Sequence, residues 1–294
     1  MKEVRKGSIL ILIAYVLWGF FPFYWAQLAD VASIEIIAYR ILLSFITCFF
    51  YLVYKKQLYI INIFKNTKVL VRFIVISLLL FVNWFVFIYA VSQGKILDAG
   101  MGYYLNPLIS ILLGIIFLKE KLNKFQIAAF VLATIGIIYY IFSMGAVPYI
   151  AITLGITFGL YGLFKKKTKI SGIHSMSIET MILTPIAIGI LIIVAKNSGL
   201  AILSGQVKIT IFIILAGIVT LTPLVLFAEA TKKIPLIRVG FLQLIAPTIM
   251  LFSGLIMGEI LTINQIISFS FIWLALILYV ISIVKGDIND RKNN

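Results

Sequence analysis

Long apolar stretches, each about the length needed to cross a membrane, alternate along the chain with short polar connections. A helix needs about 20 apolar residues to cross a hydrocarbon core about 30 Å thick. Stretches of this kind predict transmembrane helices at residues 8–29, 34–54, 69–92, 98–118, 124–143, 146–164, 177–195, 208–230, 236–258 and 262–284. The pattern therefore predicts an all-α membrane protein with ten transmembrane helices.

The composition supports a membrane protein and argues against a soluble domain. The chain of 294 residues is 63% hydrophobic and only 12% charged, whereas a soluble domain carries about 25% charged residues. The first apolar stretch is longer than the hydrophobic part of a signal peptide. We therefore expect it to be retained as the first transmembrane helix.

The positive charges predict the orientation of these helices. Nearly all of the 25 Lys and Arg residues lie in the two tails and in the even-numbered connections, and such residues accumulate in cytoplasmic loops. Both chain ends are therefore predicted to face the cytoplasm of a bacterial plasma membrane. The net charge of +15 follows from this topology, so we expect no nucleic-acid partner. The run Lys165-Lys166-Lys167 is interpreted in the same way, as a basic stretch on the cytoplasmic surface.

Two segments about 140 residues apart repeat one pattern of helix-breaking and acidic residues. Each has a proline, a glycine seven positions later and then a glutamate: Pro107, Gly114 and Glu120, and Pro247, Gly254 and Glu259. Because each half holds five helices, an odd number, the second half must be inverted relative to the first. We expect two five-helix repeats, at residues 1–144 and 145–294. Interrupted helices in matching positions of two halves indicate the binding site of a transporter.

Arg40 is the charged residue placed deepest in a predicted helix. It lies about seven residues into the second helix, which is about 10 Å at 1.5 Å per residue. A charge in the membrane is costly unless it is paired or faces water. Arg40 could extend to the membrane surface or pair with Glu35 or Asp98, and it could equally form a fixed cation that binds an anionic substrate.

Other polar and aromatic residues lie at mid-depth in the predicted helices, where hydrocarbon offers no hydrogen-bond partner. Their side chains must bond to neighbouring helices or face a polar cavity, and both interpretations stay open. In the second interpretation they line or gate a substrate pathway together with Arg40: Trp18, Asn83, Trp84, Tyr103, Tyr104, Asn106, Tyr161 and Gln243. Aromatic walls suit a ring-bearing group, while the arginine and the amides suit a carboxylate or an amide.

Prolines and two carboxylates complete the set of candidate residues. A proline inside a helix removes one backbone donor, so we expect breaks or hinges at Pro22, Pro107, Pro223 and Pro247. Glu35 and Glu179 are candidates for coupling transport to protons. Each is predicted at the start of a helix, where a negative charge is favourable, and that placement alone would explain both. Gly155 and Gly159, one turn apart, predict close helix packing.

The residues required by two other classes of function are missing. A membrane-embedded protease needs a metal-ligand or nucleophile–base set, whereas the chain has one histidine, His174, and one cysteine, Cys48. It has no P-loop, so ATP does not drive transport within this chain. We expect no enzymatic activity, no cofactor and no metal. A non-transporting receptor or accessory subunit with the same fold stays an alternative.

Together these motifs resemble the drug/metabolite transporter superfamily, in its EamA group, and most closely the RarD-like permeases. The residues that carry the resemblance are Tyr15, Trp18-Gly19, Pro22, Ala38-Tyr39-Arg40, Asn83-Trp84, Gly102 to Pro107 and Glu120, followed in the second half by Gly159, Tyr161-Gly162-Leu163, Glu179-Thr180, Pro223, Gly240 to Gln243, Ala246-Pro247-Thr248 and Glu259. They extend over residues 8–284.

The resemblance implies a plasma-membrane permease with a central cavity and alternating access, which commonly exports a small organic metabolite or drug. A proton or a counter-solute would drive such transport. Tyr39 departs from the pattern, because relatives more often have histidine before the arginine, and this makes a proton-sensing role at that position doubtful. The resemblance leaves open whether the protein is a monomer or a homodimer.

Overall fold

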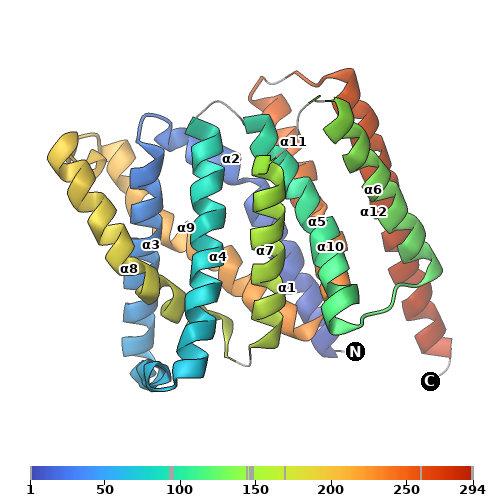
Figure 1. Ribbon diagram of the computed structural model, residues 1–294, viewed down its shortest axis with the longest axis horizontal. Coiled ribbons are helices and arrows are strands. Elements are labelled where there is room, and N and C mark those ends of the chain that lie inside the picture. Colours follow the sequence, from blue (N-terminus) through green and yellow to red (C-terminus); the bar gives the residue numbers. More distant parts are fainter. Residues whose placement is uncertain are drawn as a thin grey trace.

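The computed structural model describes residues 2–92, 96–143, 145, 149–168, 170–258 and 260–292. Helices connected by short segments build this part of the chain, and it contains no strand (Figure 1). The helices are α1 (Lys2–Gly19), α2 (Phe21–Trp25), α3 (Ser33–Tyr54), α4 (Thr67–Ser92), α5 (Ile96–Leu118), α6 (Lys124–Ser143), α7 (Tyr149–Lys167), α8 (Gly172–Asn197), α9 (Val207–Lys233), α10 (Leu236–Gln243), α11 (Ile245–Ile256) and α12 (Ile263–Lys292), with short 3-10 turns η1 (Ala26–Leu28), η2 (Leu58–Lys65) and η3 (Ala201–Leu203).

Several of these helices are long and apolar enough to cross a membrane. Within the described residues seven helical stretches meet that condition, or eight if the bent pair formed by α1 with α2 and η1 is one span. The predicted all-α membrane protein is thus confirmed, whereas the predicted number of ten spans is not. Two predicted spans are not among the stretches that qualify. The side chains of α5 are described only from residue 103 onward, and residues 103–118 form a shorter apolar helix. The other span, α7, ends in three lysines.

Two of the predicted spans are broken. α1 and α2 meet at a bend of 41°, and Pro22 lies in the first turn of α2. α10 ends at Gln243 and α11 begins at Ile245, so the second break lies at Leu244, two residues before Ala246-Pro247. Pro107 and Pro223 lie inside the continuous helices α5 and α9. Helix irregularities therefore lie beside Pro22 and Pro247.

The largest helix–helix interfaces join the first half of the sequence to the second. α6 packs on α12, α5 on α7, α3 on α8 and α1 on α9, and Figure 1 shows α6 and α12 side by side at one end of the molecule. Glycine permits one of these contacts, because a Cβ on Gly155 or Gly159 of α7 would come within 2.7 or 2.6 Å of Ile109 on α5. The close packing predicted for these glycines is therefore present.

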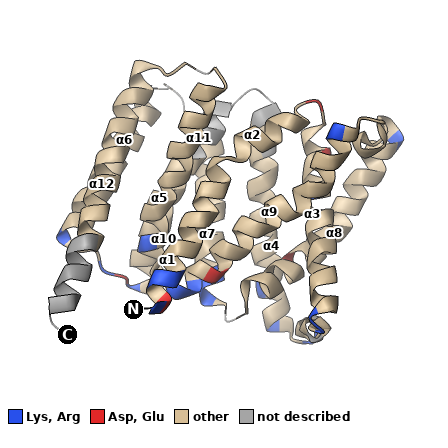
Figure 2. Cartoon of the chain, turned by 180° about the vertical axis from the view of Figure 1, so that it is seen from behind, with Lys and Arg blue, Asp and Glu red and all other residues tan. Residues whose placement is uncertain are grey.

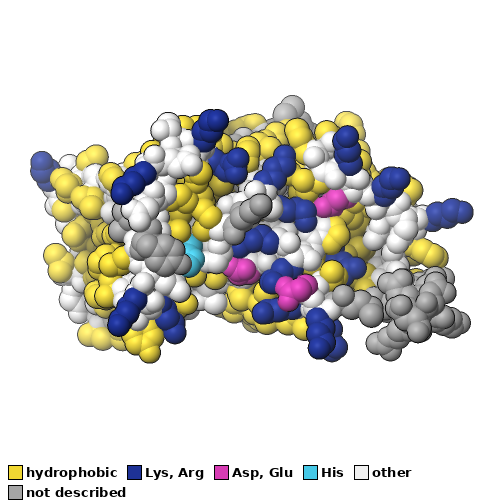
Figure 3. Space-filling view, turned by 90° about the horizontal axis from the view of Figure 1, so that it is seen from below, with side chains coloured by type: hydrophobic (Ala, Val, Ile, Leu, Met, Phe, Trp, Pro, Cys, Tyr) yellow, Lys and Arg dark blue, Asp and Glu magenta, His cyan; other side chains and the backbone are white. Residues whose placement is uncertain are grey.

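Charge and apolar surface are segregated on the outside of the bundle. Large apolar side chains are exposed on its flanks, for example Ile116 on α5, Phe142 on α6 and Ile193 on α8. Lys and Arg are concentrated at the end of the molecule where both termini lie (Figure 2). Seen from below in Figure 3, this end carries many basic side chains and few acidic ones. An exposed apolar flank between polar ends is the surface that a lipid bilayer covers.

Candidate functional site

Arg40 lies in the second turn of α3 and is only 7% exposed. Its Nε donates a hydrogen bond to Thr220 Oγ1 of α9 at 3.0 Å. The guanidinium group also lies over two indole rings, 4.7 Å from the ring centre of Trp25 and 4.6 Å from that of Trp84. A cation over an aromatic face is stabilised by the negative potential of the ring. We call Trp25, Arg40, Trp84 and Thr220 the Arg40 site.

Glu35 does not neutralise Arg40, although it lies on the same helix. Its carboxylate accepts a hydrogen bond from the backbone N–H of Ala201 at 2.7 Å, and that residue begins η3. Glu35 is buried and thus fixes the connection before α9 to the start of α3. The possible pairing of Arg40 with Glu35 is therefore wrong. The side chain of Asp98, the other possible partner, lies outside the described residues.

Asn83 and Asn106 both bond to the backbone of α7. The Asn83 amide donates to Leu154 O at 3.0 Å and to Thr157 Oγ1 at 2.9 Å. The Asn106 amide, with its nitrogen turned toward α7, donates to the carbonyl groups of Leu154 at 3.1 Å and Gly155 at 3.0 Å. These bonds satisfy the amides between helices, so α4 and α5 are both held to the same turn of α7.

Tyr103 and Tyr104 lie on α5, one turn before Pro107. The Tyr104 hydroxyl donates to the carbonyl of Pro247 at 3.2 Å, so the two proline-containing repeat segments contact each other. The ring of Tyr103 packs edge-on against Phe87 of α4. Tyr103 thus joins α5 to α4, and Tyr104 joins α5 to α11.

Glu179 belongs to a second buried cluster, at the other end of α3. Its carboxylate forms an ion pair with Lys165 and accepts hydrogen bonds from Ser175 Oγ at 2.8 Å and Tyr161 OH at 3.1 Å. Lys165 also donates to Ser175 Oγ at 2.6 Å. The side chains of Lys165 and Glu179 are both 0% exposed. We call Tyr161, Lys165, Ser175 and Glu179 the Glu179 site.

The Glu179 site corrects two predictions. Lys165 was expected on the cytoplasmic surface with Lys166 and Lys167, but it points into the bundle because the carboxylate lies there. Glu179 was expected at the start of its helix, but α8 already begins at Gly172. Its negative charge is therefore stabilised by Lys165 and two hydroxyl groups rather than by a helix end. The predicted pathway residue Tyr161 lies here and not at Arg40.

Aromatic side chains connect Tyr161 with the first helix. Trp18 packs against Phe158 and Phe227, with ring centres 5.6 and 5.7 Å apart. Tyr161 stacks on Phe227 at 6.0 Å. The hydroxyl group of Tyr15, one turn before Trp18, donates to the carbonyl of Val239 at 3.1 Å. Trp18 and Tyr161 thus belong to one aromatic cluster between α1, α7 and α9.

Gln243 lies at the helix break between α10 and α11 and is only 4% exposed. Its Oε1 has no hydrogen-bond partner in the described part of the chain. A buried acceptor without a donor is costly, and such groups are uncommon enough to indicate a function. Gln243 stays a predicted pathway residue, and the structure places it at the helix break with one unsatisfied polar atom.

Glu120 was noted in the sequence as part of the repeat and of the family resemblance, and the structure shows which groups its carboxylate binds. Its two carboxylate oxygens accept hydrogen bonds at 2.8 Å from the backbone N–H groups of Leu236 and Ile237. These are the first two residues of α10, so the carboxylate stabilises a helix N-terminus. The matching residue, Glu259, lies outside the described residues.

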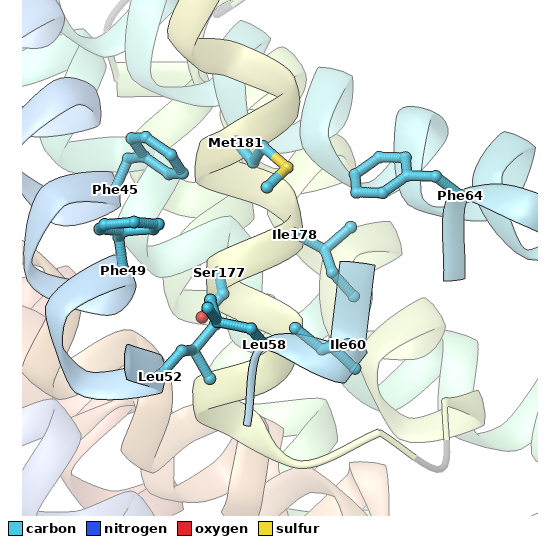
Figure 4. Close-up of a pocket in the computed structure, with 9 residues that line it drawn as sticks. All are labelled: Phe45, Phe49, Leu52, Leu58, Ile60, Phe64, Ser177, Ile178 and Met181. Atoms are coloured by element: carbon cyan, nitrogen blue, oxygen red, sulfur yellow. The ribbon is translucent and has the colours of Figure 1, made fainter. Parts of the chain in front are cut away.

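The pocket in Figure 4 is lined by no residue of the Arg40 site or the Glu179 site. It is formed between α3, η2 and α8, and its lining is apolar except for Ser177: Phe45, Phe49, Leu52, Leu58, Ile60, Phe64, Ser177, Ile178 and Met181 (Figure 4). None of the predicted pathway residues contributes to it. A pocket with this lining offers no group that would recognise a charged solute.

Apolar flanks, basic ends and buried polar groups that bond between helices define a multi-pass membrane protein. A solved crystal structure has the same fold, with a TM-score of 0.71 and 12% identity, over 93% of this chain and 96% of that chain. Residues 5–142 match the EamA-like transporter family.

Relatives from bacteria extend this match over nearly the whole chain. The chain is 42% identical over 289 residues to the Bacillus subtilis protein named uncharacterized transporter YojE, covering 96% of each chain. It is 34% identical over 288 residues to protein RarD of Escherichia coli, again covering 96% of each chain. The chain therefore belongs to the EamA-like transporter family, as a RarD-like permease of the drug/metabolite transporter superfamily.

Proposed function

We propose that the protein is a secondary transporter that moves a small organic metabolite or drug by alternating access between two inverted five-helix repeats, residues 1–144 and 145–294. One observation supports this proposal above all. The buried polar side chains of one half bond mainly to the other half, as in Arg40–Thr220, Asn83–Thr157 and Tyr104–Pro247. Such bonds can break and form again when two halves move relative to each other.

The pairing of helices supports the inverted arrangement. In the proposed numbering of ten spans, the fourth packs on the sixth as α5 on α7, and the first packs on the ninth as α1 on α10 and α11. Exchanging the halves turns the fourth span into the ninth and the sixth span into the first, so it converts the first of these contacts into the second. Two other contacts are unchanged when the halves are exchanged. They are the contact of the second span with the seventh, which is α3 on α8, and that of the fifth with the tenth, which is α6 on α12. Such pairings are expected for two halves related by a two-fold axis, and the odd number of helices in each half would place that axis in the membrane plane.

The proposed orientation places both termini in the cytoplasm, and the proposed direction is export. The basic end of the molecule carries both termini, and basic ends face the cytoplasm. Among the carboxylates considered for proton coupling, Glu179 is the better candidate, because its partner Lys165 competes with a proton for it. Glu35 is held by a backbone N–H group at the opposite end of α3.

Transport into vesicles tests this function. Inverted and right-side-out vesicles, with and without the protein, are incubated with a bacterial metabolite extract, with and without an imposed proton gradient. We expect at least one small organic solute to accumulate only with the protein, and in inverted vesicles, which report export. The variant Arg40→Ala should abolish accumulation while expression persists, and Arg72→Gln, which removes an exposed cation of α4, should not. Binding without accumulation would instead identify a receptor.

A further inference from the structure

Arg40 is a buried cation with no opposite charge beside it among the residues whose side chains the structure describes. Four charged side chains are buried in the described part of the chain: Glu35, Arg40, Lys165 and Glu179. Lys165 and Glu179 neutralise each other, and Glu35 accepts a backbone hydrogen bond at the start of η3. No described carboxylate lies within 4 Å of Arg40. A buried cation that lacks a counter-charge is costly.

Most N–H donors of Arg40 have no hydrogen-bond acceptor among the described residues. The rings of Trp25 and Trp84 lie next to the guanidinium carbon, with their centres 4.7 and 4.6 Å away. Of its five N–H donors, one is bonded to Thr220, and no described residue accepts a hydrogen bond from the other four. A carboxylate binds the edge of a guanidinium group through two parallel hydrogen bonds, and the donors of Arg40 that have no described acceptor are the groups that such bonds need.

We propose that the Arg40 site binds the carboxylate group of a small organic monoanion, and that this anion is the transported solute. The second statement rests on the proposed transport function, whereas binding does not. Charge balance favours a monoanion, because Arg40 supplies one positive charge and Lys165 is already neutralised by Glu179. A phosphate ester would bring a second negative charge that no described cation of this site opposes. The two indole rings also favour an apolar or planar body next to the carboxylate.

The bond to Thr220 connects binding with the proposed movement. Arg40 lies on α3 in the first half, and Thr220 lies on α9 in the second half. Because Arg40 is only 7% exposed, a solute reaches it only when the surrounding helices separate. Binding of a carboxylate then replaces the missing counter-charge, so the anion favours the conformation in which Arg40 is accessible.

Matched pairs of carboxylates and amides test this site. Purified protein is titrated with benzoate and benzamide, phenylacetate and phenylacetamide, and phenyl phosphate, and binding is followed by tryptophan fluorescence, since Trp25 and Trp84 flank the site. A hydrogen-bonded charge contributes about 1.5–3 kcal/mol, so we expect each amide to bind at least about tenfold more weakly than its carboxylate. Phenyl phosphate should bind more weakly than benzoate.

Variants separate the charge from the shape of the site. Arg40→Gln should abolish the preference for carboxylate, Arg40→Lys should retain part of it, and Arg72→Gln serves as a matched control for charge. A thermal unfolding curve of each variant shows that it is folded. Equal binding of amide and carboxylate, tighter binding of phenyl phosphate, carboxylate binding that persists in Arg40→Gln, or no binding of either carboxylate would overturn the proposal.

The same measurements distinguish this proposal from the proposed function. Carboxylates that bind through Arg40 but do not cross the membrane in vesicles would contradict transport and leave the anion site standing. Conversely, accumulation of a neutral or cationic solute by a protein that binds no carboxylate would contradict the anion site and leave transport standing.

Discussion

Lys165 and Glu179 form an ion pair in which neither side chain is exposed. Ser175 and Tyr161 complete the pair by hydrogen bonds to its carboxylate. The pair joins α7 to α8 and lies toward the cytoplasmic end in the proposed orientation. The buried charge at this end of the bundle is thus paired, whereas Arg40, toward the other end of α3, has no described counter-charge.

We expect Glu179→Gln to destabilise the protein more than the loss of one hydrogen bond would. The substitution leaves Lys165 buried without a counter-charge, and breaking a buried pair in this way costs about 3–5 kcal/mol. The double variant Lys165→Met with Glu179→Gln removes both charges and should recover a large part of the stability. Unfolding of the purified protein measures both effects. Equal stability of the single and the double variant would show that the pair carries no such interaction.

Gly240 and Gly189 should respond to alanine in opposite directions. A Cβ on Gly240 would lie 2.7 Å from the carbonyl oxygen of Pro107, a backbone atom, whereas a Cβ on Gly189 would meet nothing within 4 Å. We expect Gly240→Ala to cost about 1–3 kcal/mol through overpacking. Gly189→Ala, in the interior of α8, should be stabilising by up to about 1 kcal/mol through helix propensity. Thermal unfolding compares the two, and a Gly240→Ala protein as stable as the parent would refute the close approach.

Glu120 should stabilise the protein through the start of α10. We expect Glu120→Ala to cost about 1–2 kcal/mol, since two backbone N–H groups lose their acceptors at a helix N-terminus. Glu120→Gln keeps one acceptor oxygen and should cost less. Hydrogen exchange of the Leu236 and Ile237 amides gives the direct measurement. If exchange at these amides is unchanged in Glu120→Ala, another group must accept their hydrogen bonds.

Much of the fold follows from the sequence because each helix depends on local composition. The predicted spans 34–54 and 124–143 agree closely with α3 and α6. The sequence predicts a helix break at Pro247, whereas the structure has the break at Leu244, three residues earlier. The criterion of length and apolar composition does not identify α7 as a membrane span, because this helix ends in three lysines.

The candidate site was less predictable, because its bonds join residues far apart in the sequence. Arg40 was found from its depth in an apolar segment, but its partners Trp25, Trp84 and Thr220 follow only from packing. The same limit made Lys165 look like a surface residue beside Lys166 and Lys167. A basic run near a helix end indicates the membrane face and gives no information about which lysine points inward. Glu120 was noted, yet its acceptor role depends on α10, 116 residues later.

Membrane-face labelling tests the two inverted halves most directly. In a Cys48→Ala background, which removes the single cysteine, Lys121→Cys and Ile260→Cys place thiols at the matching ends of the repeated segments. Intact cells are treated with a membrane-impermeant maleimide, before and after permeabilisation. We predict that Ile260→Cys is labelled in intact cells and that Lys121→Cys is labelled only after permeabilisation. Labelling of both positions from the same face would contradict the inverted repeat and the alternating access built on it.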